Sequence, residues 1–527
     1  MMRPTSTSVM NLAHFADQAT RRHGERDALV WGEERWSWSE VNARVNAMAF
    51  ALIQDYGVQK GDRILMQSSN CNQMFESMLA VFRIGAVWVP ANFRGMPDDL
   101  DWLAESSGAV GMICHADFPQ HAAKCASRLR FTISIGASDF GANYDDVVAK
   151  NLGRTVSPVE VDRDDPCWFF YTSGTTGKPK ASVLTHGQMA FVVTNHLCDL
   201  MPATTEADST VIVAPLSHGA GVHALLMIAR GGACILPSGD RFDADDIWRL
   251  IDAHRSTSLF TVPTILKMLT EHPAVDRYNH SSLRYVIYAG APMFRVDQIH
   301  ALEKLGPVLV QYFGLGEVTG NITVLPPSEH SASDDPRPGT CGFARTGIQV
   351  QIQDNNGCEA AIGETGEFCV IGPAVFAGYW NNPSANEKAF RNGWFRTGDV
   401  GHMDAEGFFY ITGRESDMYI SGGSNIYPRE IEEKILAHVD ITEVAVLGVP
   451  DVKWGEIGVA ICVPREGCTP TAAELSEFLK PQVASYKMPK EIYFWDSLPK
   501  SAYGKITKKL VREAYMAAQS EDAEGGN

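Results

Sequence analysis

Strand-like apolar segments that alternate with helical segments constrain the fold of this chain more than any other feature of its sequence. Four such segments each end at Pro or Gly: 209–215, 233–237, 258–263 and 284–290. Helical signals lie between and before them. Ser37 and Glu40 have the spacing of a capping box ahead of an amphipathic stretch, and Thr471 and Glu474 have the same spacing ahead of another helix. Strands that alternate with helices favour an α/β fold with largely parallel sheets.

The character of the sequence changes twice along its 527 residues. From about residue 340, short β-rich pieces are separated by glycines, and from Arg414 a second unit with both helices and strands begins. We therefore expect a large N-terminal domain over 1–413, built of layered α/β sheets with a small β-rich subdomain over about 340–413. A small α+β domain should follow over 414–527, with the last dozen residues as a disordered tail.

Composition excludes several classes of function. The net charge of −18 gives no general attraction for nucleic acid or for an anionic membrane surface. No apolar run approaches the roughly 18 residues of a membrane span, and the N-terminal segment lacks the apolar stretch of a signal peptide. The eleven cysteines include no C-x-x-C pair, as expected in a reducing compartment. We expect a cytoplasmic protein.

The stretch "YTSGTTGKPK", residues 171–180, follows the apolar run "CWFFY" directly. Its glycines and its proline end the strand, and its amides, hydroxyls and ammonium groups suit phosphate oxygens. The spacing differs from the usual phosphate loop, G-x-x-x-x-G-K-[ST]. Taken alone, the stretch fits either a phosphate-binding loop or a flexible polar surface turn.

Further glycine-rich and charged motifs follow in a fixed order. They are "PLSHGAG" (215–221), "YAGAP" (288–292), "YFGLGEVTG" (312–320), "GWFRTGD" (393–399), "GRESDMYISGGSNIYPREIE" (413–432) and "LPKSAYGKI" (498–506). In order and spacing this set resembles the adenylate-forming superfamily, which contains acyl-CoA synthetases, nonribosomal adenylation domains and firefly-type luciferases. The resemblance spans about residue 11 to about residue 511. It implies that ATP activates a carboxylic acid as an acyl-adenylate and that coenzyme A then displaces AMP.

The resemblance also implies roles for the residues of the phosphate loop and for one acidic residue. The loop residues that would bind the β- and γ-phosphates of ATP are Thr172, Ser173, Gly174, Thr175, Thr176, Gly177 and Lys178. Glu317 and Thr175 would hold Mg²⁺, a hard cation that prefers oxygen ligands. Thr175, Lys178 and Glu317 are thus also candidate catalytic residues.

Other motif positions would bind the nucleoside. Asp399 matches the aspartate that accepts both ribose hydroxyls, and Arg414 matches an arginine that contacts ribose and phosphate. The adenine slot would be formed by Gly290, Ala291 and Pro292 with Phe313, and Gly314 is a further cofactor-binding candidate.

Lys505 matches the lysine that bridges the substrate carboxylate and the α-phosphate, although a lysine considered alone is more often a solvated side chain. Because it lies in the C-terminal unit, the resemblance implies a mobile C-terminal domain. This domain would rotate after adenylation and bring Ser421, Gly422 and Gly423 towards the thiol.

The sequence departs from the family pattern at two positions of interest. Gly316 replaces a usual threonine that contacts phosphate, and Ser416 stands at the hinge, where Asp or Lys is common. A weaker enzyme, or a nucleotide-binding homologue without turnover, is therefore an alternative. So is an adenylating enzyme with a carrier-protein or other acceptor. A homodimer is possible.

The sequence limits the class of carboxylic acid that the protein could activate but does not identify one acid. No aspartate lies between residues 215 and 230 to bind an α-amine, and His218 matches a histidine that flanks the acyl carboxylate. Gly314 and the small residues at 219–221, followed by Val222, are expected to leave room for a long acid. Medium- or long-chain fatty acids and aromatic (arylpropenoic) acids both fit.

Overall fold

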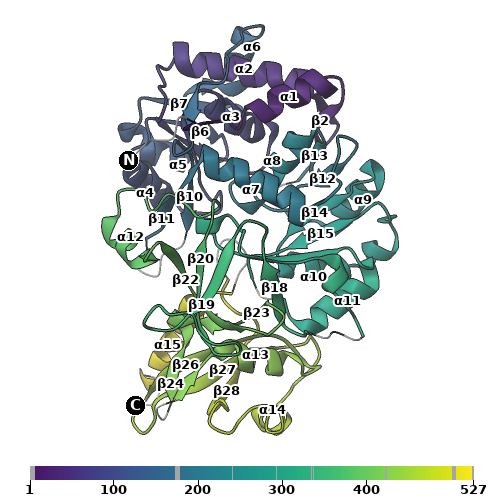
Figure 1. The fold of residues 1–527 in the computed structure, drawn as a ribbon, viewed down its shortest axis with the longest axis vertical. Helices are drawn as coiled ribbons and strands as arrows, with labels where there is room; N and C mark the ends of the chain where they lie inside the picture. The colour runs from purple at the N-terminus through teal and green to yellow at the C-terminus, as the bar shows by residue number, and fades with distance from the viewer. Residues whose placement is uncertain are drawn as a thin grey trace.

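The structure is a computed structural model (Figure 1). It describes residues 6–172, 178–239, 241–291, 293–333, 335, 337–421, 424–500 and 506–524, without the side chains of 425 and 520–524. The chain runs from an N-terminal body of sheets flanked by helices to a smaller C-terminal unit at the opposite end of the long axis.

The first sheet has seven strands in the order β11-β10-β5-β4-β6-β7-β8. All neighbours are parallel except β10 and β11, which form an antiparallel hairpin. Its strands are β4 (Arg63–Gln67), β5 (Val87–Pro90), β6 (Gly111–His115), β7 (Phe131–Ile135), β8 (Ala142–Asn143), β10 (Pro166–Thr172) and β11 (Lys180–Thr185). The helices of this region are α1 (His14–His23), α2 (Trp38–Gln54), α3 (Asn72–Arg83), α4 (Pro97–Ser107), α5 (Pro119–Cys125) and α6 (Tyr144–Asn151).

The second sheet has 14 strands and contains both parallel and antiparallel parts. The parallel part is β2 (Asp27–Trp31), β13 (Ala233–Leu236), β12 (Ser209–Val211), β14 (Ser258–Thr261), β15 (Tyr285–Tyr288) and β16 (Leu309–Phe313), with β3 (Glu34–Ser37) antiparallel at the edge. The antiparallel part continues from β16 through β17 (Thr323–Leu325), β18 (Thr340–Ala344), β23 (Phe408–Arg414), β22 (Trp394–Met403), β20 (Gly366–Ile371) and β19 (Gln349–Gln353), with β21 (Phe390–Arg391) beside β22. The β-rich stretch is thus joined by hydrogen bonds to the α/β sheet.

Helices α7 (His186–Asp199) and α8 (Gly219–Arg230) belong to the largest hydrophobic cluster, which contains residues of both sheets. Trp88 and Trp168 from the first sheet and Val310 from the second are all buried in it. The remaining helices of the body are α9 (Ala244–His254), α10 (Pro263–Glu271), α11 (Arg295–Leu305) and α12 (Pro383–Ala389). The expected α/β fold is confirmed.

The C-terminal unit is a five-stranded sheet with its own helices and its own buried clusters. Its elements are β24 (Tyr419–Ser421), β25 (Ser424–Ile426), α13 (Pro428–Leu436), β26 (Ile441–Asp451), β27 (Gly455–Pro464), α14 (Ala472–Leu479), β28 (Glu491–Phe494) and α15 (Lys508–Glu524). Because α15 continues to Glu524, the expectation of a disordered tail is wrong for most of that segment. Among the described residues, no helix combines the length and apolar character needed to cross a membrane.

Local capping signals place two helices as the sequence predicts. The Ser37 side chain accepts from the Glu40 amide and Glu40 reaches back to the Ser37 amide, which starts α2. Thr471 and Glu474 make the same reciprocal pair ahead of α14. The eleven cysteines are free.

Candidate active site

The phosphate-loop sequence is the turn of the β10–β11 hairpin. Thr172 and Lys180 are register partners at the loop end of this hairpin. The Trp102 indole donates to the Pro179 carbonyl at 3.1 Å, and the Lys178 ammonium lies 4.0 Å from the centre of the Trp102 ring. Both ends of the loop are therefore fixed. Its residues Ser173, Gly174, Thr175, Thr176 and Gly177 lie outside the described part of the chain, and their roles stay predictions.

Glu317 lies beside the end of β10, in the short 3₁₀ helix η3 (Gly316–Val318) that follows β16. Its side chain is buried, and its Oε1 atom accepts from the Thr172 hydroxyl at 3.0 Å and from the Tyr379 hydroxyl at 2.9 Å. The Phe376 amide donates to the Glu317 carbonyl at 2.8 Å, which ties this turn to the segment carrying Tyr379. Burial and the Glu317 carboxylate raise the pKa of Tyr379, so its hydroxyl remains a donor.

The surroundings of the Glu317 carboxylate are compatible with Mg²⁺ binding, because its direct hydrogen-bond partners are uncharged. Both hydroxyl donors approach Oε1, and neither brings a positive charge. Within the described ranges, no group of three or more His, Cys, Asp or Glu side chains could hold a metal ion. Mg²⁺ is commonly bound by one or two carboxylates together with phosphate oxygens and water, and a single buried glutamate matches that pattern.

Asp399 and Arg414 form a cross-strand ion pair between β22 and β23. They are register partners, and the Arg414 Nε atom lies 3.0 Å from the Asp399 Oδ1 atom. The Oδ2 atom of Asp399 is buried and has no hydrogen-bond partner among the residues that the structure describes. A buried oxygen with free lone pairs is an acceptor site for hydroxyl groups.

The pKa shifts of Asp399 and Arg414 agree with the burial of Asp399 and with the short distance between the two side chains. Burial raises the pKa of Asp399, although Arg414 and Arg429 oppose that shift. The Asp399 carboxylate raises the pKa of Arg414, and Glu317 contributes in the same direction. Arg414 is therefore within electrostatic range of both buried carboxylates.

The proposed adenine residues lie at the carboxyl ends of the neighbouring parallel strands β15 and β16. Ligands of open α/β sheets commonly bind at this edge. Gly290 follows β15 with a φ of +83°, a conformation that favours glycine, and Ala291 comes next. Phe313 ends β16, half-buried, with its ring edge-to-face with Phe368 at 5.4 Å. Pro292 lies outside the described residues.

His218, which is expected to flank the acyl carboxylate, lies directly before α8. Its Nδ1 atom is 3.0 Å from the Ser217 hydroxyl, and its ring meets the edge of the Phe170 ring at 5.1 Å. Phe170 also borders Gly316. A Cβ atom at Gly316 would lie 2.7 Å from the Phe170 ring and 2.9 Å from the Thr172 methyl group. The glycine is therefore required by the neighbouring phenylalanine, and a threonine could enter only if Phe170 shifted.

The expectation that small residues leave open volume is wrong for three glycines. A Cβ atom at Gly314 would lie 2.5 Å from the Gly320 Cα atom, and one at Gly219 would lie 2.8 Å from the Phe260 ring. At Gly221 it would lie 2.1 Å from the Leu216 carbonyl oxygen. These glycines allow close packing, so the space in front of each is already filled. Ala220 and Val222 are likewise buried.

The C-terminal unit reaches the body near Asp399. The Arg429 charge acts on Asp399, and Phe294 from the body packs against the buried cluster of the C-terminal unit. Ser421 is half-buried at the end of β24. Gly422, Gly423 and Lys505 lie outside the described residues, so the reach of Lys505 to the phosphate loop stays a prediction.

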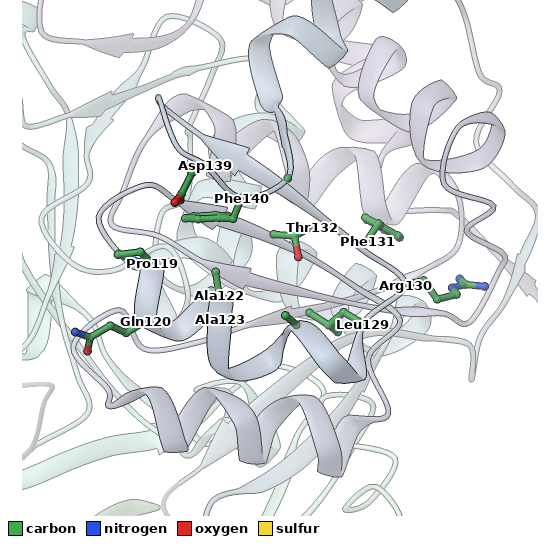
Figure 2. A pocket seen from close by; sticks show the side chains of 12 residues that line it. Pro119, Gln120, Ala122, Ala123, Leu129, Arg130, Phe131, Thr132, Asp139 and Phe140 are labelled. Atoms are coloured by element: carbon green, nitrogen blue, oxygen red, sulfur yellow. The ribbon is translucent and has the colours of Figure 1, made fainter.

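Two surface hollows lie away from these residues. Figure 2 shows the first, of about 650 Å³, between α5 and the segment that follows β7, lined by residues such as Phe140 and Leu129. The second, of about 960 Å³, lies between the start of α9 and the end of α10. Neither contains Glu317, Asp399 or His218 among its lining residues, so neither belongs to the candidate site.

Sequence reasoning missed Tyr379, which contacts Glu317, and Lys180, which lies near the Tyr379 ring. Tyr379 donates to the Glu317 carboxylate, and the Lys180 ammonium lies 5.1 Å from the centre of the Tyr379 ring. The segment "GYW" lies along β11, where the Val183 amide donates to the Gly378 carbonyl at 3.0 Å. Gly378 has a positive φ, which marks an unusual turn in this segment. That conformation is known only from the structure, so no local sequence pattern indicated the approach of Tyr379 to Glu317.

Comparisons with known proteins agree with this architecture. A sequence family described as "AMP-binding enzyme" matches residues 15–380, and one described as "AMP-binding enzyme C-terminal domain" matches residues 430–505. A feruloyl-CoA synthase of Amycolatopsis sp. is 35% identical over 93% of this chain and 96% of its own length. A long-chain-fatty-acid–CoA ligase of Mycobacterium tuberculosis is 33% identical over 92% and 94%. The crystal structure of ATP-bound MatB from Rhodopseudomonas palustris superposes with a TM-score of 0.86 at 30% identity, covering 96% of this chain and 99% of that one.

Proposed function

Since this chain belongs to the AMP-binding enzyme family, we propose that it is an AMP-forming acyl-CoA synthetase, an acid–thiol ligase that uses ATP, Mg²⁺ and coenzyme A. Its substrate is a medium- or long-chain fatty acid or an arylpropenoic acid. The name of the long-chain-fatty-acid–CoA ligase supports the first class, and the name of the feruloyl-CoA synthase supports the second.

One observation carries the proposal. Two buried carboxylates, Glu317 and Asp399, have different hydrogen-bond partners, and Arg414 is in electrostatic range of both. Asp399 offers an unpartnered oxygen for a ribose hydroxyl, while Glu317 offers a metal ion a carboxylate whose two hydroxyl partners are uncharged. An ATP–metal complex needs both features at once.

The first half-reaction joins two anions. An oxygen of the substrate carboxylate attacks the α-phosphorus of ATP, the bond to the bridging oxygen breaks, and pyrophosphate leaves. Mg²⁺, when bound by Glu317, would neutralise charge on the phosphates. Lys178 and the loop hydroxyls would hold the departing pyrophosphate, and Arg414 would hold the α-phosphate side.

In the second half-reaction the sulfur of coenzyme A attacks the acyl carbon. The bond from that carbon to the AMP oxygen breaks, AMP leaves as an anion, and the thiol proton passes to solvent. Ser421 would line the approach of the pantetheine chain with Gly422 and Gly423. The protein's part is positioning, because the mixed anhydride is already activated.

Pyrophosphate exchange tests the proposal. We expect purified protein to exchange labelled pyrophosphate into ATP with at least one acid from a panel of C8–C18 fatty acids and cinnamic, coumaric and ferulic acids, and to form the thioester once coenzyme A is added. Exchange without thioester would assign another acceptor. Nucleotide binding without exchange would contradict the proposal.

Lys505→Ala tests the division of labour between the two halves. A cation about 4 Å from developing charge is worth roughly 4 kcal/mol at an effective dielectric near 20, or about a thousandfold in rate. We expect that loss in adenylation, while thioester formation from supplied acyl-adenylate survives. Lys509→Ala, at an exposed position of α15, is the matched control. Equal loss of both half-reactions would contradict the assigned role.

A further inference from the structure

A cluster of buried polar side chains lies beside α8, outside the residues used so far. Its members are His196, His223, Asn321 and Arg345, all at most 3% exposed. The two imidazole rings are 5.3 Å apart between centroids, and the Tyr312 ring lies 5.7 Å from one and 5.9 Å from the other. Four polar side chains from separate segments thus converge in the interior.

The cluster is incompletely hydrogen-bonded. Neither ring nitrogen of His223 has a partner among the described residues. The same holds for His196 Nε2, Asn321 Oδ1 and Arg345 Nη2. Each buried polar group left unsatisfied costs about 1–3 kcal/mol, so native proteins keep few of them. Five such atoms in one place indicate that a further hydrogen-bonding group enters.

The existing bonds fix what that group must be. His196 Nδ1 faces the Val192 carbonyl at 3.1 Å, and a carbonyl can only accept. Burial lowers the pKa of His196 well below its usual value, so the ring is neutral and its Nε2 is an acceptor. Asn321 uses its amide to donate to the Thr319 carbonyl at 2.9 Å, so its Oδ1 is an acceptor too.

Donors stand beside these two acceptors. Arg345 pairs through Nε with Asp199 at 3.3 Å, which leaves Nη2 as a donor. His223 is neutral, since burial lowers its pKa to about 3, and it supplies one donor and one acceptor. A group that both donates and accepts satisfies this set. A carboxylate only accepts hydrogen bonds, so it could not donate to the two acceptors His196 Nε2 and Asn321 Oδ1.

The cluster adjoins the acyl side of the candidate site. His223 lies one helical turn after Gly219, and the Phe260 ring covers both, stacking on His223 at 4.2 Å with an interplanar angle of 10°. Tyr312 directly precedes Phe313, and Asn321 follows Glu317 by four residues. An acid with its carboxylate near His218 and its body along α8 would point its far end at this cluster.

We propose that the His196–His223–Asn321–Arg345 cluster recognises a hydroxyl group at the far end of the acid substrate, such as the phenol of a hydroxylated arylpropenoic acid. This inference rests on the proposed function and selects within its substrate range. Since the cluster's polar atoms are buried and Phe260 stacks on His223, this binding requires the half-buried Phe260 ring to move aside. Plain fatty acids and unsubstituted aryl acids leave the cluster unsatisfied.

Paired substrates test the inference on the whole enzyme. Thioester formation is measured with 4-hydroxycinnamic and cinnamic acid, and separately with 16-hydroxyhexadecanoic and hexadecanoic acid. We expect kcat/KM to favour the hydroxylated member of at least one pair by about tenfold or more, since one buried hydrogen bond is involved. A ratio near 1 in both pairs would overturn the inference and leave the proposed function intact. Failure with every acid would instead count against the proposed function.

Two variants connect the ratio to the cluster. His223→Phe keeps an aromatic ring to stack on Phe260 but removes both ring nitrogens, so the ratio should fall to about 1. His223→Gln keeps a donor and an acceptor, so the ratio should remain severalfold. An unchanged ratio in His223→Phe would show that the cluster holds only water. If that variant does not fold, His223→Leu, which also removes both ring nitrogens, takes its place with the same expected and contradicting outcomes.

Discussion

Glu317 and Asp399 are two buried carboxylates of the N-terminal body, and they have different kinds of partner. Glu317 receives two neutral hydroxyl donors on one oxygen, from Thr172 and Tyr379. Asp399 receives a charged guanidinium on one oxygen and leaves the other without a partner among the described residues. A carboxylate whose direct hydrogen-bond partners are neutral is suited to a cation. A carboxylate whose charge is balanced, with an oxygen free, is suited to a neutral donor.

Glu317→Gln should have the largest effect. The amide preserves the shape of the side chain but removes the negative charge, and an amide is a poor ligand for Mg²⁺. We expect pyrophosphate exchange to fall by about a thousandfold, or roughly 4 kcal/mol, with a weaker response to added Mg²⁺. Glu303→Gln, at an exposed glutamate of α11, is the control and should behave as the wild type.

Asp399→Asn should have the next largest effect and a different character. The uncharged amide no longer balances Arg414, and one of its two polar atoms is a donor facing the ribose hydroxyls. We expect the affinity for AMP, measured by calorimetry, to fall by about a hundredfold, roughly 3 kcal/mol. An equal loss of metal-free AMP affinity in Glu317→Gln would abolish the distinction between the two carboxylates.

Gly316→Thr tests the packing that positions Glu317. The new Cβ atom would overlap the Phe170 ring, and overpacking of this kind costs typically about 1–3 kcal/mol. We expect a lower thermal midpoint and lower activity, both partly restored by adding Phe170→Leu. If the single variant were more active than the wild type, the missing hydroxyl would matter more than the packing.

The smallest expected effect is a pH dependence of nucleotide binding. Because the pKa of Asp399 is raised, its protonation begins at a higher pH than that of an ordinary aspartate, whose pKa is about 3.9. The carboxylate form accepts from the ribose, so AMP affinity should be present above the folded-state pKa and be lost as the pH falls through it. Asp399→Asn should lack this dependence. A wild-type affinity that rises on acidification would contradict the assignment.

The sequence predicted the elements that depend on local signals. The capping boxes of α2 and α14, the strand before the phosphate loop and the carboxylate in η3 were all readable from short motifs. The Asp399–Arg414 pair could be anticipated as two separate nucleotide contacts. Its cross-strand register, which leaves one oxygen free, depends on how β22 and β23 align.

What the sequence could not give depends on contacts between distant segments. Gly314 and Gly219 suggested open space, but the space in front of a glycine is decided by whatever packs there, in this case Gly320 and Phe260. Tyr379 reaches Glu317 from 62 residues away, and no local pattern indicates that approach. The His196–His223 pairing likewise arises only when α7 and α8 meet.

The Asp399–Arg414 ion pair at the end of β23 has a consequence for the order of the two half-reactions. Arg414 is the last residue of that strand and is fixed to Asp399, while the chain leaves for the C-terminal unit through η5 (Glu415–Asp417), where Ser416 is exposed. A rotation of the C-terminal unit about Ser416 would therefore begin after Arg414 and leave the Asp399–Arg414 pair, the proposed ribose site, in place. The ribose of the acyl-adenylate would stay bound to Asp399 while the C-terminal unit replaces Lys505 with the segment 421–423. The reactive anhydride would then remain bound between the two half-reactions.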